Sequence, residues 1–249
     1  MGGHDHATAV VLARAGSRGV PGKNVRPVAG KACIAWTIET ALASRRVERV
    51  IVSSDDELAL AAGERMGAEV HHRPQALASD HASVDAATRS AIKTLDAESA
   101  GPVALLYANV PVRPSDLIDR AIARLCETHA DSVQSYVGVG KAHPWWQVRL
   151  DHVSGAVAPW EGDELFGGVY RRQDLPPAFV PDGGVLVVSR DALFHRVPGA
   201  TEGPHRFQGV DRRGVTTRPG EVIDIDSEID LRVAEAILAA RAEDGRRVG

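Results

Sequence analysis

The pattern of apolar and polar positions along the chain predicts strands that alternate with helices. Residues 8–13 form a short apolar run that stops at a glycine-containing polar loop, and residues 32–42 then carry apolar side chains at helical spacing. Residues 49–53 and 57–66 repeat this order, with Gly67 as the C-terminal stop of the second helix. The further elements expected are strands at 69–71, 103–107, 132–139, 184–189 and 221–225, and helices at 84–95, 115–127 and 228–241.

This alternation predicts a single α/β domain over residues 8–249. Strands followed by helices give a mostly parallel sheet with helices on both faces, which is a three-layer fold. Residues 1–7 are expected to be a flexible tail, in which His4 and His6 could bind a metal although a frayed polar end is the favoured interpretation.

Residues 141–181 break the regular pattern. They hold three of the four tryptophans together with several prolines and glycines, and they show no helical period. We therefore expect an arm inserted into the domain, whose apolar side chains need a second surface, and a symmetric homodimer would supply it. Trp145 and Trp146 could stack on a base or a sugar, but packing at a subunit interface is favoured.

Composition and charge narrow the possible partners. The chain has 249 residues and is 44% hydrophobic, and its 29 Lys and Arg against 33 Asp and Glu give a net charge of −4. This charge argues against a nucleic acid polymer as partner and favours a small molecule. Cys33 and Cys126 are expected to be buried thiols, and no apolar run approaches ~18 residues, so a cytoplasmic protein that does not enter membranes is expected.

The loop after the first expected strand carries the clearest chemical signal. From Arg14 to Asn24 it combines three glycines with Arg14, Arg18 and Lys23, so its backbone can turn tightly and present amides and cations to an anion. The spacing differs from the Walker loop and from the dinucleotide fingerprint. We interpret the loop as a polyphosphate cradle, the alternative being a solvated basic turn.

Two acidic sequences lie at other strand ends. Asp224 and Asp226 are two residues apart, which on a strand places both carboxylates on one face, where they could flank a hard cation; an N-cap of the next helix by Asp226 or Ser227 is equally compatible with the spacing. For residues 53–56 helix capping is favoured. His71 and His72 are expected to be half-exposed structural residues, and no histidine spacing indicates a zinc site.

Several of these stretches together resemble the CMP-sialic acid synthetases, also called acylneuraminate cytidylyltransferases. The resemblance extends from the first strand to the last helix. The stretches that carry it are residues 12–24, 52–56, 73–80, 172–176 and 223–231.

The resemblance implies a Rossmann-like nucleotidyltransferase fold and a set of residue roles. CTP phosphates would be held by Arg14, Ser17, Lys23 and Asn24, and the cytosine by Arg73, Asp80 and Ala82. Asp224 and Asp226 would hold Mg²⁺, and together with Arg14 and Lys23 they would form the catalytic set.

For the acceptor, the resemblance implies a site completed by the arm of a partner subunit. The residues concerned are Tyr107, Asn109, Arg113, His143, Arg172 and Gln173, of which Arg113 or Arg172 would pair with the sugar carboxylate.

The expected reaction is activation of a sialic-acid-like 3-deoxy-2-ulosonic acid by CTP. Residues 107–113 read Tyr-Ala-Asn-Val-Pro-Val-Arg where sialic acid enzymes have Gln-Pro-Thr-Ser-Pro-Leu-Arg, so the acceptor identity stays open. A cytidylyltransferase for another acceptor and a catalytically silent nucleotide-binding module are the alternatives.

Overall fold

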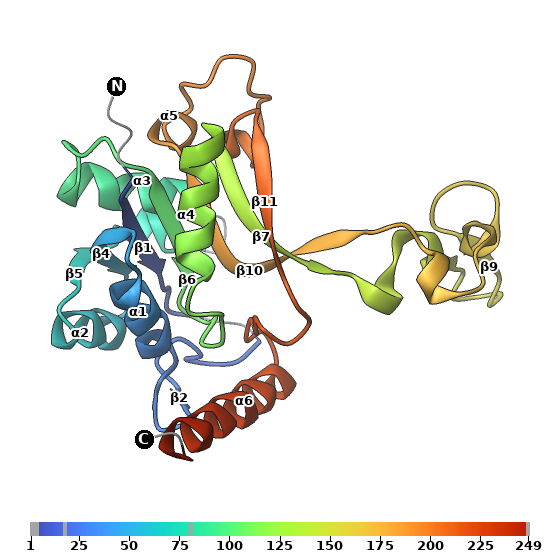
Figure 1. Cartoon of the computed structure of the whole chain (residues 1–249), viewed down its shortest axis with the longest axis horizontal. Helices are drawn as coiled ribbons and strands as arrows, with labels where there is room; N and C mark the ends of the chain where they lie inside the picture. The colour runs from blue at the N-terminus through green and yellow to red at the C-terminus, as the bar shows by residue number, and fades with distance from the viewer. Residues whose placement is uncertain (1–4, 17–18, 80–81, 248–249) are drawn as a thin grey trace.

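The computed structural model describes residues 5–16, 19–79 and 82–247, with side chains described as far as Glu243. A seven-stranded sheet forms its centre (Figure 1). Only β10 runs antiparallel to its neighbours in this sheet, so the expected mostly parallel sheet is confirmed. In sheet order the strands are β11 (Arg212–Thr217), β7 (Ser132–Gly138), β10 (Phe179–Val188), β6 (Val103–Tyr107), β1 (Ala7–Leu12), β4 (Val47–Ser54) and β5 (Glu69–His72).

Helices cover both faces of the sheet, which confirms the three-layer α/β fold. Along β1 the residues alternate between the two cores: Val11 packs with α1, α2 and α4, whereas Val10 packs with α3 and α5. Because both faces are covered, all of β1 is buried. The helices are α1 (Cys33–Ala43), α2 (Glu57–Arg65), α3 (Val84–Leu95), α4 (Leu117–Thr128), α5 (Arg190–Leu193) and α6 (Glu228–Arg247).

A third, smaller core anchors α6. Leu231, Ala234 and Leu238 of this helix pack with Cys33 at the start of α1 and with Ile225. This packing brings the last part of the chain beside the loop that follows β1. Residues more than 200 positions apart therefore meet at one edge of the sheet.

Three local expectations were wrong and one strand was missed. Residues 221–225 form no strand, because Ile223 makes only an isolated bridge to Val112. Strand β11 was not expected, because its sequence is polar and only Val215 and Thr217 are buried at the sheet edge. Ala7 belongs to β1 rather than to a tail. The fourth helix begins at Leu117 after Asp116, and no side chain caps it. The expected tail residues 1–4 lie outside the described part of the chain.

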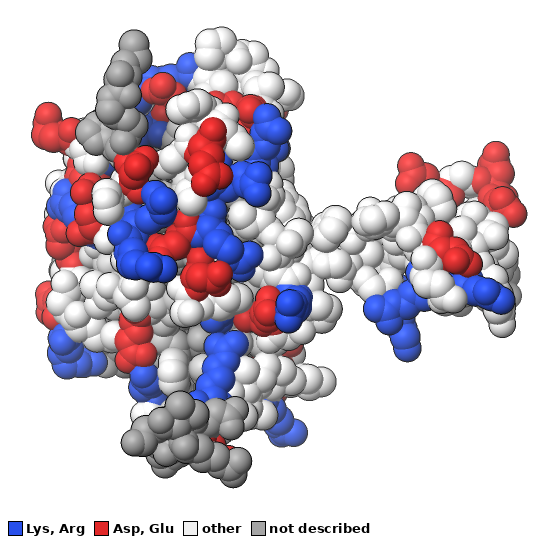
Figure 2. All heavy atoms as spheres, in the orientation of Figure 1, with Lys and Arg blue, Asp and Glu red and all other residues white. Residues whose placement is uncertain are grey.

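The segment between β7 and β10 protrudes from the body as an arm (Figure 1). Figure 2 shows that the surface of the neck joining it to the body carries few charges. Its elements are η2 (Gly140–Ala142), η3 (Pro144–Trp146), β8 (Val148–Leu150), β9 (Val157–Pro159), η4 (Leu165–Gly168) and η5 (Arg172–Asp174). Elsewhere lie β2 (Pro27–Val28), β3 (Lys31–Ala32), η1 (Gln75–Leu77) and η6 (Arg206–Gln208).

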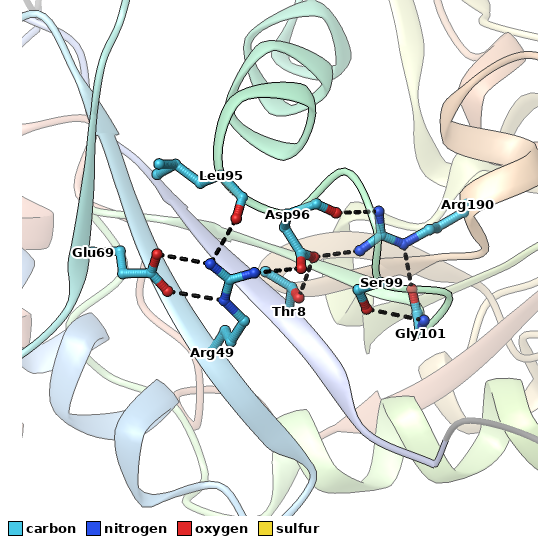
Figure 3. A network of polar contacts seen from close by, with 8 residues as sticks. All are labelled: Thr8, Arg49, Glu69, Leu95, Asp96, Ser99, Gly101 and Arg190. Atoms are coloured by element: carbon cyan, nitrogen blue, oxygen red, sulfur yellow. Dashed lines mark hydrogen bonds and ion pairs between the residues drawn. The ribbon is translucent and has the colours of Figure 1, made fainter.

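An ionic network around the buried carboxylate of Asp96 ties the amino ends of the parallel strands together (Figure 3). The carboxylate of Asp96 accepts a hydrogen bond from Thr8 Oγ1 at 2.6 Å and one from Arg49 Nη1 at 2.6 Å, and it pairs with Arg190. Arg49 also forms a two-armed pair with Glu69. The network joins β1, β4, β5 and α5 at the end of the sheet opposite to the loop after β1.

Cys33 is buried and Cys126 half-buried, and the two cysteines are not joined in a disulfide bond. Burial raises the pKa of Cys33 to about 12, so this thiol is protonated and inert. The prediction of buried thiols is therefore confirmed for Cys33 and only partly for Cys126. Within the described residues, none of the helices has the length and apolar character required to cross a bilayer.

Candidate active site

A pocket of about 490 Å³ opens at the carboxyl ends of β1 and β6. This is the edge where an open α/β sheet binds its ligands. Its lining combines cations, one carboxylate and small apolar residues. The sequence-predicted residues among them are Arg14, Lys23, Asn24, Arg73, Ala82, Tyr107, Asn109 and Asp226.

The loop after β1 is held closed by its own side chains and by the C-terminal segment. Asn24 is buried, and its amide donates to the carbonyl of Arg14 at 2.9 Å, which fixes the two ends of the loop together. Gly19 packs against the backbone of Asp226 so closely that any Cβ at position 19 would collide with the Asp226 carbonyl oxygen. A glycine is therefore required there. Ser17 lies outside the described residues.

Lys23 joins the loop to the acidic segment at the other end of the sequence. Its ammonium donates to the carbonyl of Ile225 at 2.9 Å and to Asp226 Oδ1 at 2.7 Å. The Lys23 side chain is only 17% exposed, whereas that of Asp226 is 74% exposed. An ammonium has three N–H donors, and within the described residues two of them are used by these contacts.

The structure separates the two interpretations of the acidic pair. Ser227 and Asp230 cap α6: Ser227 Oγ donates to Asp230 Oδ2 at 2.7 Å and receives the backbone N–H of Asp230 at 3.4 Å. The cap is therefore Ser227, and the carboxylate of Asp226 is directed to Lys23 instead. The segment is not a strand, but Ile225 N donates to the carbonyl of Asn109 at 2.9 Å, which fixes it against the end of β6.

Asp224 lies deeper than Asp226. The amide of Asn109 donates to Asp224 Oδ1 and, at 3.3 Å, to the carbonyl of Ile225. Burial, together with the nearby Asp226 carboxylate, raises the pKa of Asp224 to about 6, against the opposing effect of Lys23. Such a carboxylate is readily stabilised in its charged form by a cation.

The expected cytosine segment also borders the pocket. Arg73 donates through Nη2 to the carbonyl of Ser53 at 2.7 Å, and burial lowers its pKa. Ala82 also lines the pocket, and its backbone N–H is already donated to the carbonyl of Ser79. Asp80 lies outside the described residues.

Sequence reasoning missed a role for Asp55. For residues 53–56 we favoured helix capping, and Asp56 does cap α2 by accepting from the N–H of Leu58 at 2.9 Å. Asp55, however, accepts the N–H of Ala15 at 2.9 Å and so holds the start of the loop after β1. Its place at the carboxyl end of β4, beside β1, was the signal that could have indicated this contact.

The comparisons with known proteins decide the family. A family described as cytidylyltransferase matches residues 8–146, which is more than half of the chain. The chain belongs to the cytidylyltransferase family.

The sequence relatives of this family member include enzymes named for sialic-acid-like sugars. The chain is 39% identical over 232 residues to the N-acylneuraminate cytidylyltransferase of Escherichia coli, covering 92% of this chain and 51% of that protein. It is 28% identical over 243 residues to the CMP-N,N'-diacetyllegionaminic acid synthase of Legionella pneumophila, and this match covers 94% of this chain and 97% of that protein. The chain spans about half the length of the N-acylneuraminate cytidylyltransferases that it matches.

A solved structure supports the fold. The structure of CMP:2-keto-3-deoxy-manno-octonic acid synthetase complexed with CTP aligns with a TM-score of 0.70, covering 95% of this chain and 99% of that one at 17% identity. At this identity the similarity establishes the nucleotidyltransferase-like α/β fold and nothing finer.

The expected acceptor residues are divided between the pocket, the interior and the arm. Tyr107 and Asn109 line the pocket, whereas Arg113 is buried beneath the surface and does not. Nε of Arg113 donates to the carbonyl of Gly184 at 3.1 Å, while its two terminal nitrogens make no hydrogen bond among the described residues. Burial lowers the pKa of Arg113 to about 10.

The remaining acceptor residues lie on the arm. His143 is buried within it and contacts the carbonyl of Pro176 at 3.1 Å, and Arg172 and Gln173 are exposed in η5. None of the three lines the pocket of its own chain. The family match ends at residue 146, so it covers the pocket loop and β6 but only the start of the arm.

Proposed function

We propose that the protein is a Mg²⁺-dependent cytidylyltransferase that activates a sialic-acid-like 3-deoxy-2-ulosonic acid with CTP, giving a CMP-sugar and pyrophosphate. The observation that supports this best is the contact of Lys23 with Asp226 in a pocket that Arg73 also lines. A cation on a glycine loop, a carboxylate beside it and a base-facing segment are what a nucleoside triphosphate requires. The names of the sequence relatives support cytidine and an acidic sugar.

In this reaction the anomeric hydroxyl oxygen of the sugar attacks the α-phosphorus of CTP. The new bond joins that oxygen to phosphorus, the hydroxyl proton passes to water, and the bond to the bridging oxygen breaks, so pyrophosphate leaves with the electron pair. Negative charge grows on the leaving oxygen. Lys23 and Arg14 line the pocket, and together with the loop amides they would stabilise this charge.

The donor set fits Mg²⁺ rather than zinc. Within the described residues, no three His, Cys, Asp or Glu side chains form a metal cluster. Mg²⁺ needs no such cluster, because one or two carboxylates and the substrate phosphates commonly hold it. Asp224 and Asp226 would supply the carboxylates, and the bound ion would neutralise phosphate charge and polarise the α-phosphate.

The acceptor site would be completed by a second copy of the chain. The arm carries many exposed apolar side chains, which a two-fold partner would cover. Arg172 from the partner's arm would then reach the pocket beside Tyr107 and Asn109, and its guanidinium would pair with the sugar carboxylate. The exposed apolar residues of the arm are Trp145, Val148, Leu150, Val153, Val157, Trp160, Leu165, Phe166 and Tyr170, and Phe179 and Val180 follow at the start of β10.

One observation favours an acidic sugar with other substituents as the acceptor. The residues Tyr107 and Asn109 that line the pocket replace the glutamine and threonine of the sialic acid enzymes. The acceptor could therefore be a differently substituted acidic sugar. A panel of substrates distinguishes the two without changing the reaction class.

The test is pyrophosphate release with CTP, Mg²⁺ and a panel of acidic sugars that includes N-acetylneuraminate, legionaminate and ketodeoxyoctonate. We expect release with at least one of them, and thermal stabilisation by CTP with Mg²⁺ that exceeds the shift with ATP or GTP. Equal shifts with all the triphosphates would contradict the cytidine specificity. A CTP-specific shift without release on any acidic sugar would support a silent nucleotide-binding module.

A further inference from the structure

Four side chains form a continuous line of contacts from helix α3 to the nucleotide pocket. Ser90 Oγ in α3 lies 3.1 Å from His71 Nε2, and His71 Nδ1 lies 3.0 Å from Ser53 Oγ. Arg73 then donates to Ser53 twice, from Nε to the hydroxyl oxygen at 3.4 Å and from Nη2 to the carbonyl oxygen at 2.7 Å. Of the four, Arg73 lines the pocket.

The line has a direction that follows from its donors. A guanidinium can only donate, so Ser53 Oγ accepts from Arg73; with a neutral His71 whose Nδ1 is the acceptor, the Ser53 hydrogen is donated to that nitrogen. The hydrogen of His71 then resides on Nε2 and is donated to Ser90. His71 and Ser53 are both buried, with 4% and 0% of their surface exposed. Burial and the nearby Arg73 lower the pKa of His71, which agrees with a neutral ring.

The expectation that His71 is half-exposed was therefore wrong, while His72, the next residue, is exposed as the alternation of a strand requires. His71 lies on the face of β5 that meets α3. A buried position of this kind ordinarily holds an apolar side chain, so a histidine is expected there only if its two ring nitrogens make hydrogen bonds. Nε2 of His71 contacts Ser90, and Nδ1 contacts Ser53, which accepts from Arg73.

We propose that His71 is a positioning residue for nucleotide recognition, which orients the Ser53 hydroxyl and through it holds the Arg73 guanidinium toward the pocket. The proposal rests on the proposed function, because it requires that the pocket binds CTP. His71 would affect the affinity and selectivity for the nucleotide rather than the transfer step itself.

A purely structural link between β5 and α3 is the competing explanation, and three variants separate the two. His71→Leu removes both contacts. His71→Asn keeps an amide oxygen near the position of Nδ1 and so retains an acceptor for Ser53. Ser90→Ala is the matched control, because it removes only the contact between His71 and α3.

The measurements are KM for CTP, kcat, and the preference for CTP over UTP. For His71→Leu we expect KM for CTP to rise about three- to tenfold, the value of one hydrogen bond, with kcat within about twofold of wild type and a weaker preference for CTP. His71→Asn should recover most of the affinity, and Ser90→Ala should leave KM unchanged. Ser53→Ala, which keeps the buried volume nearly constant, should reproduce the effect of His71→Leu even if that variant folds poorly.

Three results would overturn the proposal: a wild-type KM for CTP in folded His71→Leu and Ser53→Ala, an equal loss in Ser90→Ala, or a fall in kcat with unchanged KM. The test is separate from that of the proposed function. If wild-type protein neither releases pyrophosphate with any acidic sugar nor is stabilised by CTP, the proposed function fails. If the wild type releases pyrophosphate and is stabilised by CTP, but the variants have the same KM for CTP as the wild type, only the proposed role of His71 is contradicted.

Discussion

At the scale of single residues, neighbouring residues in the acidic segment before α6 make different contacts. Ser227 and Asp230 close the helix end, while Asp224 and Asp226 face Asn109 and Lys23. Capping and cation binding therefore use different side chains. This division lets mutation test each role without disturbing the other.

Replacing Asp224 by Asn should abolish most activity without weakening the fold. Loss of a charge that stabilises the transition state costs about 10²–10³ in kcat. The folding stability of this variant, in contrast to its activity, should rise. The pKa of Asp224 is raised to about 6, so the folded protein holds this proton more tightly than the unfolded chain, and stability falls as pH rises from about 4 to about 6.

At pH 8, with chelator present, the Asn variant should therefore be more stable than wild type, by an amount on the order of 1 kcal/mol because the group is only partly buried. Denaturant unfolding measures this difference. Ser227→Ala is the control, and it should lose about 1 kcal/mol while keeping its kcat. A large loss of stability with retained activity in Asp224→Asn would show that this residue is structural.

At the scale of elements, the two ends of the sheet have separate functions. The carboxyl ends of β1 and β6 form the pocket, and the amino ends of β1, β4 and β5 meet at Asp96. The Asp96 carboxylate is 1% exposed and pairs with two arginines. The network therefore contributes to the order of the strands and not to the chemistry.

Removal of this carboxylate should destabilise the fold and leave nucleotide binding intact. Asp96→Ala leaves Arg190, which is 9% exposed, without its charge partner, and the expected loss is about 3–5 kcal/mol. Glu69→Gln is the matched control at the exposed side of the same network, with an expected loss below about 1 kcal/mol. Thermal unfolding gives the stabilities. The KM for CTP of the folded Asp96 variant should stay within about twofold of wild type, and a larger change would mean that the two ends are coupled.

At the scale of the whole molecule, the arm leaves the domain with an apolar surface that its own body does not cover. Val153 and Tyr170 are 99% and 95% exposed, and the neck that connects the arm to the body carries few charges (Figure 2). Arg172 lies on this arm and outside the pocket of its own chain. A shared active site is the arrangement that would use both features.

Complementation between two inactive chains tests this arrangement. Lys23→Ala and Arg172→Ala should each be inactive alone, because each removes one cation from the site. After subunit exchange, one of the two sites in a mixed dimer contains both residues if the arm crosses to the partner, so activity should return. If each chain completes its own site, every site still lacks one residue. Continued inactivity after proven exchange, or a monomer in light scattering, would contradict the shared site.

The sequence by itself determined the elements whose signals are local. The apolar run of β1, the helical period of α3 and the glycine and cation pattern of residues 14–24 each depend on neighbours in the chain, so their positions could be predicted. The same holds for the pocket, because a phosphate-binding loop after the first strand of a parallel sheet must lie at the carboxyl edge.

Only the tertiary structure decided which distant groups meet. The contact of Lys23 with Asp226 spans 203 positions, and the burial of Arg113 depends on strand β10. Strand β11 exists because β7 offers it backbone partners, although its own sequence is polar. The two contacts of His71 come from β4 and α3. Such contacts depend on packing between elements, and a local pattern of residue types carries no information about the partner that packing will supply.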